Sequence, residues 1–269
     1  MFIFVTKLII NLIFLYMFKN KIMTLFLYIS INFGYSQSNG TFKEIGVMAG
    51  PVFFQSDYGE RGDFENYIKQ NGFSIGVFYY LTPNINSKNI GENLKFRLEA
   101  SYMKSQLQHY GKWVDPNNKE KFANQLRAMR GSVSTKNLGF QVEYYPFKTD
   151  DYCRFCRLFN PYASLGTQLS GYTSEISSSL GQLGTPKTTP EKFINGYRNT
   201  NAITGSFTAG FGVRYKFANE MSALIFDYRL QYYYTDWIDG LNPDKSIYPE
   251  NKSNDYSTTF NFGYVYYFQ

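Results

Sequence analysis

The segment from Tyr256 to Phe268 alternates strictly between two kinds of residue. Aromatic residues fill most of the alternate positions, and the positions between them are mostly small or polar. Successive side chains of a β-strand point to opposite faces, so one face of this segment is aromatic and the other is not. Such a strand is typical of a membrane barrel, with lipid on one side and a lumen on the other. Asn261, Gly263, Tyr266 and Phe268 mark it as the strand that closes the barrel. The alternative, a soluble sandwich, would leave an aggregation-prone edge.

The same alternation recurs in seven further segments. Their apolar rows lie at about residues 45–53, 73–81, 94–102, 138–144, 161–169, 207–217 and 224–234. Eight is an even number and the smallest size among outer-membrane barrels, and a tilted spanning strand needs roughly 9–11 residues. The sequence therefore predicts an all-β fold, a monomeric eight-stranded antiparallel up-and-down transmembrane barrel in the outer membrane of a Gram-negative bacterium.

The connections between these segments alternate in length. Long connections are predicted at about 55–72, 104–136, 172–203 and 235–255, and shorter ones at 82–93, 147–160 and 218–221. Outer-membrane barrels have long external loops and short periplasmic turns. We therefore expect both termini of the barrel to lie on the periplasmic side.

The amino-terminal residues 1–36 have the features of a secretory signal peptide. Lys19 and Lys21 precede an apolar run, and small residues precede a cleavage site before Gln37. Met17 is the expected translation start, although residues 1–36 can also be interpreted as two membrane helices. Residues 37–269 then form the barrel domain. Removing the leader lowers the net charge from +6 to +3, which gives no support for a nucleic-acid partner.

The inward-facing positions of the predicted strands carry charges of both signs. They are Glu44, Lys95, Arg97, Glu99, Glu143, Arg214, Lys216, Asp227 and Arg229. A barrel of this size has an interior just wide enough to be filled by side chains. If the last tight turn pairs Arg214 with Ile225, then Asp227 lies diagonally within reach of Arg214. These charges form either an ion network that closes the lumen or an open ion pathway.

The inventory of catalytic residues is small. His109 is the single histidine, and its place in the second outer loop predicts a solvent-exposed side chain. Hydrolysis or acyl transfer needs a nucleophile, a base and an orienting carboxylate in mutual reach, and no acid with a matching position accompanies His109 and Ser105. We therefore predict no catalytic residue, no cofactor and no metal site. An enzyme remains an alternative through an unrecognised pair of carboxylates.

Cys153 and Cys156 form the motif Cys-Arg-Phe-Cys in the inner turn at 147–160. A zinc site needs two more ligands, which are missing nearby. In an oxidising periplasm the pair forms a local disulfide or remains a reactive dithiol. A stiffened turn of this length suits a docking surface for a periplasmic protein.

The second outer loop is the most basic region. Asp115-Pro116 predicts the start of a short amphipathic helix that ends near Gly131, with Phe122, Leu126 and Met129 on one face. Its basic side suits lipopolysaccharide phosphates or an acidic partner, and a solvated lid is the alternative. The third outer loop is rich in Ser, Thr, Gly and Pro, which predicts a flexible segment.

Several short motifs resemble the small outer-membrane barrels of Bacteroidota. They are Gly34-Tyr35-Ser36-Gln37, Glu44-Ile45-Gly46-Val47 with Gly50, Asn160-Pro161-Tyr162-Ala163-Ser164-Leu165-Gly166 and the closing aromatic strand. The pattern is similar to PorG-like barrels associated with type IX secretion and to the wider OmpA/OmpX-like superfamily. This resemblance implies a contact with a periplasmic secretion complex, and the lack of a catalytic constellation predicts a non-catalytic structural or interaction component. A lipid-active enzyme or a narrow channel is the alternative.

Overall fold

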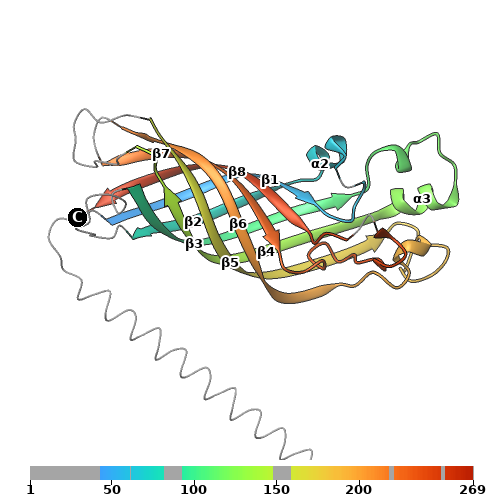
Figure 1. Ribbon diagram of the computed structural model, residues 1–269. Helices are drawn as coiled ribbons and strands as arrows, with labels where there is room; N and C mark the ends of the chain where they lie inside the picture. The colour runs from blue at the N-terminus through green and yellow to red at the C-terminus, as the bar shows by residue number, and fades with distance from the viewer. Residues whose placement is uncertain are drawn as a thin grey trace, which may run out of the picture. The chain divides into compact units, whose positions relative to one another are not determined.

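The computed structural model describes residues 43–60, 62–81, 93–147, 159–217, 221–249 and 252–268. These residues form eight antiparallel strands in one closed barrel, in which β8 returns to pair with β1 (Figure 1). The strands are β1 (Lys43–Gln55), β2 (Asn71–Leu81), β3 (Leu94–Gln108), β4 (Met129–Tyr144), β5 (Phe159–Ser178), β6 (Thr200–Lys216), β7 (Ser222–Tyr233) and β8 (Tyr256–Phe268). The predicted fold is confirmed. The leader, the inner-turn residues 82–92 and 148–158 with Cys153 and Cys156, and residues 218–220 lie outside the described ranges.

The alternation of the sequence decides which side chains face outward. Ile45, Leu165 and Phe262 are among the outward residues and are each about half exposed or more, whereas the residues between them face the lumen. The outward rows together cover the barrel with exposed apolar and aromatic groups, whereas large contiguous apolar surfaces are rare on soluble monomers. None of the helices in the described ranges is both long and apolar enough to cross a membrane.

Four strands extend further toward the outer loops than the sequence indicates. β3 continues to Gln108, β4 begins at Met129, β5 continues to Ser178, and β6 begins at Thr200. The predicted loops at 104–136 and 172–203 were therefore too long. In the extensions of β3, β4 and β5 the outward side chains are mostly polar and buried apolar residues such as Val133 face inward, so the pattern of a lipid-facing row is reversed although the backbone still pairs. In the extension of β6 the outward Ile203 is still apolar and exposed.

The outer connections contain short helices that gather at one end of the barrel (Figure 1). They are α2 (Phe64–Lys69), η2 (Lys112–Val114), α3 (Lys121–Ala128) and η3 (Glu191–Phe193). The helix predicted from Asp115 to Gly131 was wrong in its bounds, because the chain turns through 115–118 and β4 already begins at Met129. Leu126 and Met129 are buried, although Met129 already belongs to β4, whereas Phe122 is partly exposed. The third outer loop also packs: Phe193 and Thr189 are buried in it.

The seam between β1 and β8 closes the barrel. Ile45 pairs with Tyr266, Met48 with Gly263, and Lys43 with Phe268. Asn261 faces the lumen, where its side chain accepts a hydrogen bond from Ser74 Oγ at 2.5 Å. A closed antiparallel barrel with an even number of strands and an apolar exterior satisfies every backbone group without water. This is the architecture of a Gram-negative outer-membrane protein, as predicted.

Candidate functional site

Eight of the nine predicted lumen charges are buried inside the barrel. The positive ones are Lys95, Arg97, Arg214 and Arg229, and the negative ones are Glu44, Glu99, Glu143 and Asp227. The ninth, Lys216, is only partly buried, and its Nζ lies 5.5 Å from the centre of the Tyr267 ring. We call the eight buried residues the lumen network. Its positive and negative charges balance.

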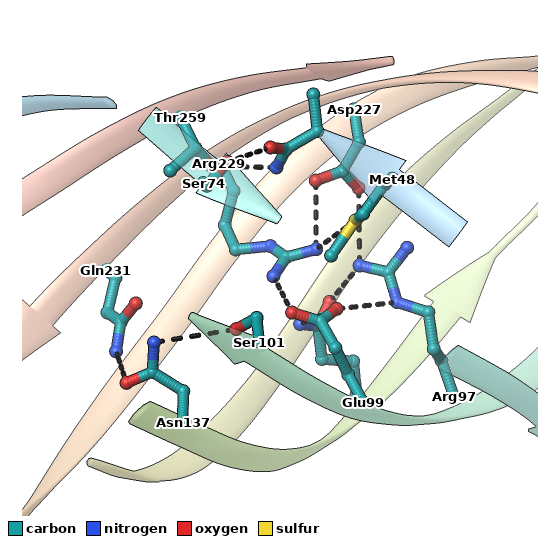
Figure 2. A network of polar contacts seen from close by, with 12 residues as sticks. Met48, Ser74, Arg97, Glu99, Ser101, Asn137, Asp227, Arg229, Gln231 and Thr259 are labelled. Atoms are coloured by element: carbon teal, nitrogen blue, oxygen red, sulfur yellow. Dashed lines mark hydrogen bonds and ion pairs between the residues drawn. The ribbon is translucent and has the colours of Figure 1, made fainter. Parts of the chain in front are cut away.

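Arg97 is the centre of the lumen network. Its side chain is fully buried, and its guanidinium lies 2.9 Å from Glu143, 3.3 Å from Asp227 and 3.4 Å from Glu99. Arg229 forms two further ion pairs, at 2.6 Å to Glu99 and 2.9 Å to Asp227. Figure 2 shows both guanidinium groups between the carboxylates of Asp227 and Glu99. The four side chains thus form one ring of alternating charge.

This ring spans the lumen. Arg97 and Glu99 lie on β3, and Asp227 lies on β7. With eight strands in sequential order around the barrel, β3 and β7 are diametrically opposite. Because ion pairs connect opposite walls directly, the interior at this level is filled by side chains rather than by a pore.

A second group of charges lies at Glu44. Its carboxylate pairs with Lys95 and with Arg214, both at 2.5 Å. Nearby, the hydroxyls of Tyr80 and Tyr145 donate hydrogen bonds to Glu143. The predicted register of Arg214 opposite Ile225 is found.

The expected pairing of Arg214 with Asp227 was wrong. Arg214 forms an ion pair with Glu44 on β1, and Asp227 forms ion pairs with Arg97 and Arg229. Diagonal neighbours on one hairpin can be inferred from spacing along the sequence. Partners across a lumen cannot be inferred in this way, because their positions depend on how the whole sheet curls.

His109 is buried, which contradicts the prediction of an exposed loop residue. Only 4% of its surface is accessible, and its ring lies 4.8 Å from that of Tyr58 and 5.9 Å from that of Phe193, centre to centre. Gly59 N donates a hydrogen bond to Nδ1 at 2.9 Å. Burial, with smaller contributions from Lys192 and Arg130, lowers the pKa of His109 to about 3. The imidazole is therefore neutral, with its proton on Nε2.

His109 lines a pocket among the outer loops, with a volume of about 580 Å³. The walls come from all four outer loops and include several aromatic rings. The lining residues are Asp57, Gly59, Glu60, His109, Tyr110, Trp113, Phe122, Leu126, Glu191, Lys192, Phe193 and Tyr248. We call this cavity the outer-mouth pocket. The sequence offered no signal for it, because the contributing residues are spread over nearly 200 positions without a common motif.

A cluster of buried acids also lies among the outer loops. Asp57, Asp236 and Asp255 present carboxylate oxygens within 4.8 Å of one another. Oxygen-only sets of this kind suit Ca²⁺. Lys245 forms an ion pair with Asp236 at 2.9 Å, which offsets one charge. Asp239 lies beside this cluster. Burial, and then the nearby Asp57, raise the pKa of Asp239 well above its usual range. A protonated Asp239 adds no negative charge to the cluster.

No family model matches this sequence, and no curated protein matches it. Among solved structures, the attachment invasion locus protein Ail of Yersinia pestis, crystallised with a heparin analogue, is 12% identical, covers 85% of this chain and 100% of its own, and has a TM-score of 0.40. A major outer membrane protein of Thermus thermophilus is 13% identical, covering 84% and 99%, with a TM-score of 0.45. The outer membrane enzyme PagL is 11% identical, covering 83% and 98%, with a TM-score of 0.39.

Proposed function

We propose that this protein is a non-conducting outer-membrane barrel that serves as a structural or interaction component, not as a channel or an enzyme. The observation that carries this proposal is the ring of Arg97, Glu99, Asp227 and Arg229, which joins opposite walls of the lumen. An ion that passed this level would have to separate buried ion pairs. Leaving one member of such a pair without its partner costs about 3–5 kcal/mol.

The surroundings of His109 support a role without catalysis. Nδ1 accepts the backbone N–H of Gly59, and within the described part of the chain Nε2 has no hydrogen bond. A general base for a serine or threonine nucleophile would be hydrogen-bonded to that hydroxyl and oriented by a carboxylate. His109 has neither contact among the described residues.

Two outward-facing lysines support a contact with lipopolysaccharide. Lys104 and Lys136 are exposed on the adjacent strands β3 and β4, and Tyr102 pairs with Lys136 just beyond the apolar rows. The register makes the two lysines diagonal neighbours, roughly 7–8 Å apart. Neither has an ion-pair partner among the described residues. Their position at the end of the lipid-facing surface suits the phosphate groups of an outer-leaflet lipid.

A periplasmic protein is the second proposed partner. The support is the length of the inner turns at 82–93 and 147–160, the latter with Cys153 and Cys156, and the resemblance to PorG-like barrels of Bacteroidota. A Cys153→Ser/Cys156→Ser variant and a variant with residues 148–158 replaced by a short turn would be compared with the parent in crosslinked outer membranes. We expect both to recover less of the partner complex. Equal recovery from all three would remove the inner turns from the proposal.

The decisive experiment for the closed lumen is a planar-bilayer recording of the purified barrel. We expect no steady conductance from the parent protein. The Arg97→Ser/Arg229→Ser variant lacks both guanidinium groups of the ring. We expect it to show conducting events, because the ring closes the lumen. Steady conductance of the parent would contradict the proposal. Conversion of outer-membrane lipids by the parent, lost in His109→Ala, would establish the enzyme instead.

A further inference from the structure

We propose that the outer-mouth pocket binds a small saccharide without negative charge. This goes beyond the closed barrel, because the pocket lies among the outer loops and uses none of the lumen network. Its volume of about 580 Å³ falls within the range of roughly 300–1,000 Å³ found for small-molecule sites. Its lining combines aromatic rings with a few polar groups, as such sites do.

The aromatic residues provide a platform for a sugar ring. Trp113 is 50% exposed at the pocket, and its ring meets that of Phe122 edge to face, at 6.3 Å and 88°. Tyr248 and Phe193 also line the pocket, from other loops. A sugar ring carries a face of C–H groups that packs on an aromatic face while its hydroxyls remain at the rim.

His109 supplies a hydrogen-bond donor that the described residues leave unused. Since Nδ1 accepts from Gly59, the proton of the neutral ring lies on Nε2, and this atom is buried without a partner. A buried donor without an acceptor destabilises the folded state. Such a group requires an explanation, and a hydroxyl oxygen of a bound ligand would satisfy it.

The charged groups of the pocket indicate which ligands fit. Asp57, Glu60 and Glu191 contribute carboxylates, whereas Lys192 contributes one cation, whose Nζ lies 5.1 Å from the centre of the Tyr248 ring. Lys112, next to Trp113, forms an ion pair with Glu60 at 2.9 Å, so the carboxylates of the lining exceed the cations at the pocket by one. A hydroxyl both donates and accepts, so it matches carboxylates and His109 alike. An acidic sugar would be repelled by the carboxylates.

The two tryptophans of the chain make the binding directly measurable. Trp237 lies outside the pocket, where its ring stacks with the Arg198 guanidinium at 3.9 Å. In a Trp237→Phe variant, the fluorescence therefore reports Trp113 alone. The probes are methyl β-glucoside as the neutral sugar, glucosamine as the cation and glucuronate as the anion. We expect saturable changes with the first two and binding of glucuronate at least about tenfold weaker, because of the excess carboxylates.

Two pocket variants test the assignment of roles. His109→Asn retains an acceptor near the Nδ1 position for Gly59 but removes the Nε2 donor, and we expect about tenfold weaker binding of methyl β-glucoside. Trp113→Ala removes the platform, and its binding is followed by saturation-transfer NMR. Glu175→Gln, on the outer extension of β5 and outside the pocket, is the control that keeps the parent affinity. Each variant must first show the unboiled gel migration of the folded barrel.

Three results would overturn the proposal. The first is the absence of saturable binding by both methyl β-glucoside and glucosamine. The second is sugar binding that His109→Asn and Trp113→Ala leave unchanged, which would place it elsewhere. The third is tighter binding of phenylethylamine than of either sugar, which would make the pocket a site for aromatic amines.

Discussion

Arg97 shows what a single lumen residue contributes. It is fully buried and serves three carboxylates on β3, β4 and β7. We predict that Arg97→Met destabilises the folded barrel by about 3–5 kcal/mol, because three buried carboxylates lose their shared cation. Urea unfolding in detergent measures this. Adding Asp227→Asn to Arg97→Met should restore part of the lost stability. If the double variant loses the full sum of the two single losses in free energy of unfolding, Arg97 and Asp227 do not interact as the network requires.

His109 provides a second prediction at the residue scale. Its pKa of about 3 lies below the ordinary value of 6.5, so between these values the unfolded chain binds one more proton than the folded chain. Stability is therefore complete above pH 6.5 and falls as the pH is lowered toward 3, by at most about 1.4 kcal/mol per pH unit.

Because His109 is the single histidine, one imidazole signal in an NMR titration reports it without assignment. We expect that signal to remain at its neutral position down to about pH 4, and His109→Phe to lack the corresponding slope of stability with pH. A titration midpoint near 6.5 would instead show the exposed side chain that the sequence indicated.

At the scale of the strand, the sequence was most informative where lipid is in contact with the protein. The outward rows such as Ile45 to Phe53 were correctly assigned, because hydrocarbon on one side and a lumen on the other enforce a period of two. Beyond the lipid the outward face becomes mostly polar while apolar residues such as Leu107 and Ile176 face inward, so the pattern of a lipid-facing row is reversed, and the extensions of β3 to β6 could not be recognised. The helix α3 was placed too early for a related reason: capping residues indicate where a helix can begin, whereas loop packing decides where it does.

The seam between β1 and β8 leads to a prediction about glycine. A Cβ on Gly50 would collide with the backbone carbonyl of Phe260 on β8. We predict that Gly50→Ala lowers the temperature at which the unboiled, folded band disappears from a detergent gel. Gly171→Ala is the matched control, because its Cβ would meet only Lys136 O, at 3.9 Å. Equal melting of both variants would show that the seam tolerates the extra carbon.

For the molecule as a whole, the sequence indicated the charged residues of the lumen but neither their partners nor the outer-mouth pocket. Alternation places a residue inside the barrel, since it depends only on neighbours along one strand. The partners of Arg97 depend on closure of the complete sheet. The pocket depends on four loops that meet only in space, which is also why the burial of His109 was missed.

The orientation and depth of the barrel can be tested on one strand. Leu165 lies in the apolar part of β5, and Glu175 lies in its polar outer extension. We predict that a membrane-impermeant maleimide labels Glu175→Cys on intact cells but does not label Leu165→Cys, because lipid covers the latter. Both changes are made in a Cys153→Ser/Cys156→Ser background. Labelling of Leu165→Cys, or of neither cysteine, would contradict the assigned membrane position.

The ion pair between Arg97 and Asp227 also constrains how the barrel is assembled. These residues are 130 positions apart and belong to opposite walls, so they meet only after the sheet has curled through half a turn. A flat sheet would leave Arg97 with only its partners on β3 and β4, and Asp227 with only Arg229 on its own strand, while both groups faced hydrocarbon. The ion pairs across the lumen form only when the sheet closes, so closure and the last step of charge pairing are one event.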